Sequence, residues 1–386
     1  MYKKLGYYYF RLKSKQIKKE GIMTTTENYK KGIKITEIDT PSIVVDLNIA
    51  EDNIKKMQSF ANDNNVSMRP HSKTNKSPFW AKKQVDAGAI GICCAKLGEA
   101  EMMASGGIQE ILIPNQIVTE QKIKRLVDVN KKSKVMVAVE NKDNVSDLSD
   151  HFEKNSMKLS VIIEVNVGMD RCGVELDEIA DFAKFIINKP GLEFEGIMGY
   201  EGHTVNIGNF EDRVNETTKA MNKLINAKKI LEDNGIKVKI VSASGTGTYN
   251  ITSKIPGITE LQCGSYIFMD GNYLKIFGDF QPALSLLCTV VSRRGNSIVI
   301  DCGLKSVSMD QGLPEVVYPK GIKLLSLSEE HCKCEIEGDS DLKIGDKVFV
   351  RPMHSDTTIN LHDNYFVYRD GVFDEMVEIL GRGKFK

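Results

Sequence analysis

The stretch Leu159-Ser-Val-Ile-Ile-Glu-Val-Asn-Val167, followed by Asp177-Glu-Ile-Ala-Asp-Phe-Ala-Lys-Phe-Ile-Ile187 and by a β-rich run from Phe194 to Tyr200, decides the fold. The middle segment has apolar residues at helical spacing, so the unit predicts strand, helix and strand. Similar β-rich runs occupy residues 67–71, 90–95, 110–115, 134–140, 238–243 and 261–269, which makes eight candidate strands between residues 42 and 270. Eight parallel strands alternating with helices predict an α/β fold, a (β/α)8 barrel whose active site forms where strands end in loops.

The pattern changes after residue 270 to short strands separated by turns. Candidate strands there span residues 284–292, 297–300, 321–327, 333–336, 347–352 and 365–369. This pattern is typical of a compact antiparallel β domain. We therefore predict a barrel over residues 42–270 and a C-terminal β domain over residues 271–386, completed by residues 23–41.

The first 22 residues are basic and rich in tyrosine, and their apolar run Tyr7-Tyr-Tyr-Phe10 is too short for a signal peptide. We expect translation to begin at Met23. Residues 1–22 are then a non-native or disordered extension.

Composition limits the choice of partner. The chain of 386 residues has 52 basic and 52 acidic side chains, which removes the global electrostatic reason to expect nucleic acid or a membrane surface as a partner. No run of about 18 apolar residues spans a bilayer. Eight cysteines without a secretory signal indicate reduced thiols in a cytoplasmic protein. A small-molecule substrate is the expected partner, and Cys332 and Cys334 are expected to pack in a strand rather than to bind metal.

Lys73 follows the first barrel strand in the motif Arg69-Pro-His-Ser-Lys73. A lysine at that place points into the barrel mouth, where desolvation can lower its pKa enough for it to form an imine with an aldehyde. A solvated loop lysine is the alternative.

Small residues and hydroxyls follow the seventh strand in Ser242-Ala-Ser-Gly-Thr-Gly-Thr-Tyr249. Their unobstructed amides are what a phosphate cradle requires, and such cradles are common at this end of barrels. The run Gly264-Ser-Tyr266 can close the other side, and a tight turn is the alternative. Arg171 can contact a cofactor oxygen, and His203 in Tyr200-Glu-Gly-His203 is either a general base or an ordinary loop histidine.

An imidazole and a carboxylate stand two residues apart in Pro352-Met-His-Ser-Asp356, just after a strand-like run. On an extended backbone His354 and Asp356 project to the same side and can bind one divalent cation. The β domain must then fold over the barrel mouth. Together, the lysine, the phosphate cradle and the ring contact indicate pyridoxal phosphate.

Five motifs jointly resemble one family: Arg69-Pro-His-Ser-Lys73, Val165-Asn-Val-Gly-Met-Asp-Arg-Cys-Gly173, Tyr200-Glu-Gly-His203, Gly245-Thr-Gly-Thr-Tyr249 and His354-Ser-Asp356. It is the D-threonine aldolase and D-serine dehydratase branch of the alanine-racemase-type, fold type III, pyridoxal-phosphate enzymes. The resemblance implies a homodimer, the cofactor imine on Lys73 and a metal at His354 and Asp356. It also implies that Arg171 and Tyr200 contact the cofactor, with Gly245, Thr246, Gly264, Ser265 and Tyr266 around its phosphate.

The metal motif resembles the aldolases of this branch, which have His-x-Asp where the dehydratases have His-x-Cys. We therefore predict a lyase that cleaves D-threonine-like β-hydroxy-α-amino acids to glycine and an aldehyde, with Lys73 and His203 as catalytic residues. A carboxylate ligand favours Mn²⁺ or Mg²⁺ over Zn²⁺. Two alternatives remain: a D-serine or D-3-hydroxyaspartate dehydratase, and a non-catalytic pyridoxal-phosphate carrier. Asn75 departs from the histidine of many relatives.

Overall fold

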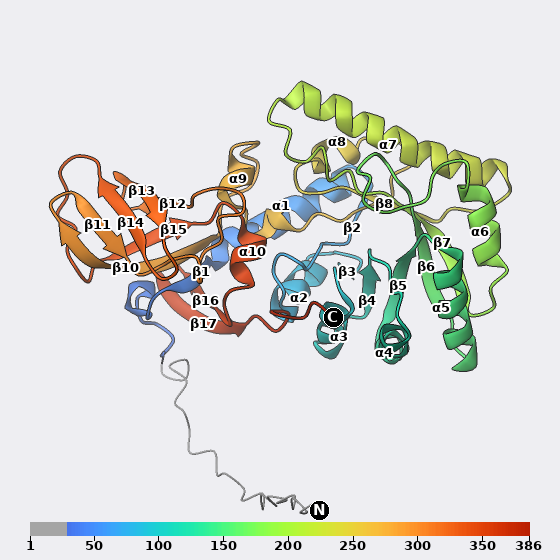
Figure 1. The fold of residues 1–386 in the computed structure, drawn as a ribbon, viewed down its shortest axis with the longest axis horizontal. Helices are drawn as coiled ribbons and strands as arrows, with labels where there is room; N and C mark the ends of the chain where they lie inside the picture. The colour runs from blue at the N-terminus through green and yellow to red at the C-terminus, as the bar shows by residue number, and fades with distance from the viewer. Residues whose placement is uncertain (1–28) are drawn as a thin grey trace, which may run out of the picture.

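The computed structural model of the chain describes residues 29–386, which form two β-sheets with helices around one of them (Figure 1). The expected extension at residues 1–22 and the expected start at Met23 lie outside the described residues. The barrel and the β domain predicted from the sequence are both present, and the predicted fold class is confirmed.

The first sheet is parallel, with the strand order β2-β9-β8-β7-β6-β5-β4-β3. Its strands are β2 (Ser67–Met68), β3 (Ile92–Cys93), β4 (Glu110–Ile113), β5 (Lys134–Val139), β6 (Leu159–Glu164), β7 (Leu192–Met198), β8 (Ile240–Ala243) and β9 (Glu260–Leu261). Every residue of β6 is buried, because strands of a parallel sheet are covered on both faces. This is why its sequence is a nearly continuous apolar run.

The edge between β2 and β3 is closed by a parallel bridge between His71 and Cys93. The backbone NH of Cys93 donates to the carbonyl of Pro70 at 2.8 Å, and that of Ser72 donates to the carbonyl of Cys93 at 2.8 Å. The bridge brings the sheet to closure immediately before Lys73. The lysine therefore leaves the sheet at the carboxyl end of its strand.

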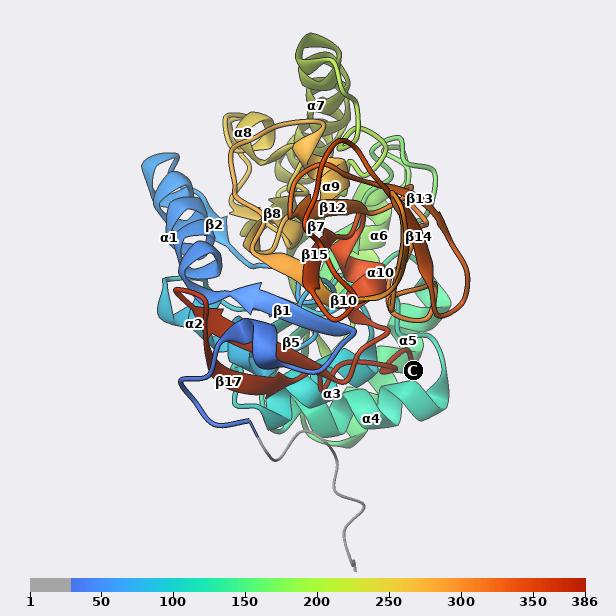
Figure 2. The same cartoon turned by 90° about the vertical axis from the view of Figure 1, so that its left-hand side faces the viewer.

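Helices follow the strands on the outside of the barrel (Figures 1 and 2). They are α1 (Leu47–Asp63), α2 (Pro78–Asp86), α3 (Leu97–Ser105), α4 (Glu120–Asn130), α5 (Lys142–Lys154), α6 (Ile179–Ile187), α7 (Phe210–Asp233) and α8 (Tyr249–Thr252). Helix α1 begins where the Asp46 carboxylate accepts hydrogen bonds from the NH groups of Asn48 and Ile49, the arrangement expected of an N-cap. No helix among residues 29–386 is long and apolar enough to cross a membrane.

The second sheet has nine strands and surrounds the core of the β domain. Its strands are β1 (Ser42–Asp46), β10 (Leu284–Arg294), β11 (Ser297–Ile300), β12 (Glu315–Tyr318), β13 (Ile322–Leu327), β14 (Cys332–Ile336), β15 (Lys347–Arg351), β16 (Asn364–Arg369) and β17 (Val372–Glu378). All pairs are antiparallel except β1 with β16. Strand β1 belongs to this sheet, whereas the sequence placed residues from 42 onward in the barrel.

Buried cysteines gather in the β domain. Cys288, Cys302, Cys332 and Cys334 are all fully buried free thiols, and the Sγ atoms of Cys332 and Cys334 lie 3.6 Å apart. All eight cysteines of the chain are free. Cys332 and Cys334 alternate along β14 toward the core, as expected for packing positions.

The two sheets meet beside the loop that carries Lys73. Trp80 stacks edge-to-face on Phe268 and on Tyr365, with centroids 5.2 and 6.1 Å apart. The short helices η3 (Ser265–Ile267), α9 (Gly271–Leu274) and α10 (Ser355–Ile359) lie where the second sheet faces the barrel (Figures 1 and 2). Helix α10 is joined to the segment after β9, because Ser355 Oγ donates to the carbonyl of Met269 at 2.8 Å. A further short helix, η2 (Ile35–Glu37), precedes β1.

Candidate active site

A cavity of about 130 Å³ opens at the carboxyl ends of the barrel strands. The cavity is lined by seven residues that the sequence predicted for the site: Lys73, Arg171, Tyr200, Gly245, Thr246, Gly264 and Ser265. The other lining residues are His71, Ala95, Pro114, Asn115, Met198, Ser244, Gln262 and Tyr273. The lining contains two cationic side chains, those of Lys73 and Arg171. None of the lining residues in the described part of the chain carries a carboxylate. The cavity therefore suits an anionic ligand.

Both cations of the cavity lie close to the ring of Tyr200. Lys73 Nζ is 5.9 Å from the ring centroid and the guanidinium carbon of Arg171 is 5.8 Å from it. Burial raises the pKa of Tyr200, while the charge of Lys73 acts in the opposite direction. Tyr200 stays neutral, and it can contact a bound ring as a hydrogen-bond donor or an aromatic face.

His71 is a cavity residue whose role the sequence did not assign. The backbone NH of Lys73 donates to its Nδ1 at 3.3 Å, so the neutral ring carries its proton on Nε2. Burial, and after it the positive charge of Lys73, hold the pKa of His71 well below its usual 6.5. A neutral imidazole adds no positive charge beside Lys73.

On the glycine-rich side of the cavity, which we call the glycine wall, the backbone packs so closely against neighbouring groups that there is little room for a side chain. A Cβ on Gly264 would lie 2.7 Å from the carbonyl oxygen of His71, and one on Gly245 would lie 3.1 Å from the Tyr200 ring. Thr246 Oγ1 accepts from the backbone NH of Tyr266 at 3.2 Å, which joins the β8 and β9 loops. Glycine is needed at these two positions because a Cβ atom would press against the His71 backbone or the Tyr200 ring.

Glu201 supports this wall from behind. Its carboxylate is fully buried and accepts hydrogen bonds from Thr248 Oγ1 at 2.7 Å, Thr252 Oγ1 at 2.6 Å and the backbone NH of Ser244 at 3.1 Å. Buried charges in proteins are hydrogen-bonded in this way. The carboxylate therefore fixes the loop that begins after β8.

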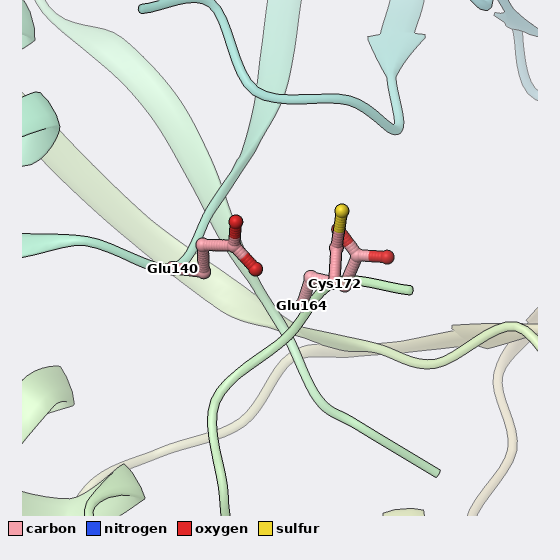
Figure 3. A group of neighbouring side chains, drawn as sticks. All are labelled: Glu140, Glu164 and Cys172. Carbon is pink, nitrogen blue, oxygen red and sulfur yellow. The ribbon is translucent and has the colours of Figure 1, made fainter. Parts of the chain in front are cut away.

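Glu140, which lies beside Glu164 and Cys172 (Figure 3), holds the loop that presents Arg171. Glu140 accepts a hydrogen bond from the backbone NH of Gly173, and Glu164 accepts one from Gln116 Nε2. With Cys172 they form a group whose candidate ligand atoms lie within 4.8 Å of one another. Burial raises the pKa of Glu164 and of Cys172. Since the Glu140 carboxylate already holds the loop, we assign it to the placement of Arg171.

His354 and Asp356 lie at the start of α10, between the sheets. The expectation that both stand on an extended backbone is wrong, because only His354 is extended and Asp356 belongs to the first turn of the helix. His354 Nδ1 lies 2.6 Å from Asp310 Oδ2, which leaves Nε2 free for another ligand. Asp356 Oδ1 is buried and has no hydrogen-bond partner among the described residues. An imidazole nitrogen and an orphaned carboxylate oxygen fit a divalent cation.

Asp270 ties the barrel to this pair. Its Oδ1 accepts from the NH of Tyr273 at 2.9 Å and its Oδ2 from the NH of Ser355 at 3.3 Å. Burial, with a smaller contribution from the Asp356 carboxylate, raises the pKa of Asp270 to about 6. Burial, followed by the charges of Tyr200, Asp270 and Asp356, raises the pKa of the cavity residue Tyr273. The Asp356 carboxylate therefore acts electrostatically on the cavity.

Three residues singled out in the sequence lie outside the cavity wall. His203 is exposed in the loop after β7, its Nε2 3.7 Å from where a Cβ on Gly168 would stand. Tyr266 is buried behind the wall, where its hydroxyl accepts from Gln84 Nε2 at 2.9 Å. Asn75 points to Gln84 and to the NH of Ser77, and therefore away from the cavity.

The site residues that the sequence analysis missed do not belong to any recognisable motif. Asn115, Met198 and Gln262 follow or end barrel strands, so strand position alone predicts that they face the mouth. Asp310 lies 44 residues before its partner His354 and belongs to no motif. It is found only when the chain is folded.

A closed eight-stranded barrel with a lysine after its first strand and a glycine-rich wall after its last two, joined to a β domain, defines an alanine-racemase-type protein. The model of the alanine racemase N-terminal domain matches residues 45–271, and that of a serine dehydratase domain matches residues 283–368. The chain belongs to this family, as predicted.

Named relatives are similar over almost the whole chain. A 3-hydroxy-D-aspartate aldolase of Paracoccus denitrificans is 36% identical, over 92% of this chain and 94% of that protein. A D-threonine aldolase of an Arthrobacter species is 34% identical, over 91% and 95%. The crystal structure of D-threonine aldolase from Filomicrobium marinum has a TM-score of 0.90 at 31% identity, covering 93% of this chain and 99% of that one.

The family implies pyridoxal phosphate, and the cavity fits it. Lys73 lines the same cavity as the glycines of the loops after β8 and β9, and the two lining cations match an anionic cofactor. The hydroxyl of Thr74 is fully buried without a partner in the described part of the chain, and it faces the Gly264 backbone at the wall. A buried hydroxyl of this kind is a place where a ligand oxygen can be accommodated.

Proposed function

We propose that this protein is a pyridoxal-phosphate- and divalent-metal-dependent lyase that cleaves D-β-hydroxy-α-amino acids to glycine and an aldehyde. The observation that carries the proposal is the orphaned Asp356 Oδ1, two residues after His354, whose Nε2 is left free by the contact of Nδ1 with Asp310. Asp270 ties this segment to the barrel. The aldolase relatives named above support the reaction type, and the dehydratases are more distant relatives.

The proposed roles follow from position. Lys73 Nζ is the covalent anchor for the cofactor aldehyde, and Arg171 and Tyr200 contact its ring substituents and face. Gly245, Thr246, Gly264 and Ser265 hold its phosphate through the glycine wall, with Tyr266 supporting them through its backbone NH. When bound, the cofactor supplies an electron sink for the bond broken at the α-carbon.

The metal pair handles the other half of the substrate. His354 and Asp356 would hold Mn²⁺ or Mg²⁺, with Zn²⁺ a weaker candidate because one ligand is a carboxylate. A cation held there would supply Lewis-acid chemistry that lowers the pKa of a substrate β-hydroxyl. His203 Nε2 is proposed to take the hydroxyl proton, and its exposed loop must then move toward the cavity when substrate binds.

The decisive experiment incubates the purified protein with pyridoxal phosphate, Mn²⁺ and a panel of D- and L-β-hydroxy amino acids, and measures glycine and ammonia. We expect glycine from the D-substrates only. Asp356→Ala and Lys73→Ala should each lose this activity, whereas Asp339→Ala, at an exposed carboxylate of the β domain, should keep it. Unchanged cleavage by Asp356→Ala would disprove the metal role.

Two other functions are separated by the same assay. A dehydratase on this scaffold releases ammonia and a 2-oxo acid without glycine. A non-catalytic cofactor carrier releases neither product, and it does not need the metal pair or the β domain. We also propose that the protein is a homodimer, which sedimentation of the purified protein tests.

A further inference from the structure

Asp310 makes the closest contact with a proposed metal ligand. Its Oδ2 lies 2.6 Å from His354 Nδ1, and its Oδ1 accepts from Ser308 Oγ at 2.7 Å and from Thr357 Oγ1 at 2.9 Å. Both carboxylate oxygens are therefore engaged. They come from the loop between β11 and β12, far in sequence from α10.

That loop is fastened to α10 by further hydrogen bonds. The backbone NH of Ser308 donates to Thr358 Oγ1 at 3.2 Å, and His362 Nε2 contacts the carbonyl of Ser306 at 2.7 Å. These bonds hold the Asp310 backbone next to the start of α10. The contact between Asp310 and His354 is part of this fixed arrangement and not an isolated surface pair.

An acceptor on Nδ1 determines the chemistry of the other ring nitrogen. A carboxylate at Nδ1 keeps the proton there, leaves the Nε2 lone pair free for a cation, and makes the imidazole a stronger ligand. It also fixes the ring about its Cβ–Cγ bond. The exposed fractions of the two side chains, 28% for His354 and 39% for Asp310, leave access for an incoming ion.

We propose that Asp310 is the positioning residue of the metal site: it orients His354 and sets its tautomer so that Nε2 can bind the cation. The proposal rests on the proposed function only for the identity of the ion. Asp310 Oδ2 faces Nδ1, the ring nitrogen remote from the proposed ligand atom Nε2, and Oδ1 accepts from two hydroxyls, so we assign Asp310 to positioning and not to binding the metal.

The test measures Mn²⁺ affinity without substrate, from the electron paramagnetic resonance signal of free Mn²⁺ titrated with the pyridoxal-phosphate-loaded protein. Removal of such a supporting carboxylate typically weakens metal affinity about 10- to 100-fold, and we expect this loss for Asp310→Ala. Asp310→Asn keeps an oxygen that accepts from Nδ1–H, so its loss should be smaller. The matched control Asp339→Ala should bind Mn²⁺ as the wild type does.

The thermal unfolding midpoint of the metal-free protein separates positioning from folding. We expect Asp310→Asn to unfold at the wild-type temperature, and it keeps the test valid if the alanine variant does not fold. Affinity within twofold of wild type for both variants would overturn the proposal. So would an Asp310→Asn variant as weak as Asp310→Ala, because Asp310 would then be a direct ligand.

Failure of the proposed function gives a different result. If the wild type binds Mn²⁺ through Asp356 but releases no glycine, the function fails and the role of Asp310 stands. If Asp356→Ala binds Mn²⁺ as tightly as the wild type, the metal site is elsewhere and both proposals fail. A wild-type protein that is active while Asp310→Ala retains full Mn²⁺ affinity overturns the role of Asp310 alone.

Discussion

The hydroxyl of Tyr365, on β16 of the second sheet, donates a 2.7 Å hydrogen bond to the backbone carbonyl of Asn75, two residues after Lys73. Both groups are buried. The backbone NH of Gly381 makes a second such contact with the carbonyl of Lys76 at 2.8 Å. The C-terminal part of the chain therefore holds the loop that carries the proposed cofactor lysine.

Tyr365→Phe should destabilise this junction without creating a cavity. The change leaves the carbonyl of Asn75 buried without its partner, which costs about 1–3 kcal/mol. The free energy of unfolding in urea measures the loss. Tyr318→Phe is the control, because Tyr318 is 63% exposed and should unfold as the wild type does. Equal stability of both variants would show that the bond does not hold the loop.

A buried ion pair joins the first and last strands of the barrel. Arg69 donates to Glu260 through Nε at 3.1 Å and Nη2 at 3.0 Å, with both side chains almost fully buried. Glu260→Gln leaves the arginine charge uncompensated, and such a loss costs about 3–5 kcal/mol. Glu216→Gln, which removes an exposed partner of Lys219, should have little effect on the urea unfolding curve. Similar curves for the two variants would contradict this assignment.

Local sequence was sufficient for the barrel and most of the β domain. The run at residues 159–167 is apolar because β6 is buried on both faces, and β14 alternates because one of its faces meets solvent. The predicted barrel began at residue 42 and so included β1, which belongs to the second sheet. Its partners in β10 and β16 lie more than two hundred residues away. Such pairing is a property of the folded chain.

The candidate site shows the same division between local and long-range information. Residue type and motif identified Lys73, the glycine wall and the pair His354 and Asp356. The backbone of that pair was predicted incorrectly because α10, of five residues, is too short to show helical periodicity. Asp310 approaches His354 only through the fold.

Gly264→Ala should weaken cofactor binding more than it weakens the fold. Its Cβ would stand 2.7 Å from the backbone carbonyl of His71, so the wall must shift toward or away from the cavity. We expect a loss of pyridoxal-phosphate affinity of at least tenfold, equivalent to about 1.4 kcal/mol. Gly278→Ala is the matched control, since nothing lies within 4 Å of its Cβ position. Titration of the apo-protein by visible absorbance measures both, and equal affinities would contradict this role of the glycine wall.

His71 should leave a signature in the pH dependence of stability. Burial and the charges of Lys73, Lys76 and Arg171 hold its pKa in the folded protein well below 6.5, the value expected when the chain is unfolded. Below pH 6.5 the unfolded chain therefore gains a proton that the folded protein does not bind. Stability falls as pH decreases from 6.5 toward the folded pKa, by up to about 1.4 kcal/mol per pH unit, and nothing is lost above 6.5.

His71→Asn should lack the histidine's contribution to the dependence of the unfolding free energy on pH. Its apo-protein should therefore lose less stability on acidification than the wild-type apo-protein. His331→Asn, at an exposed histidine, should keep the wild-type slope. Urea unfolding on both sides of pH 6.5 gives the comparison. Parallel slopes for wild type and His71→Asn would mean that the imidazole protonates freely in the folded cavity. The neutral histidine beside Lys73 would then be excluded.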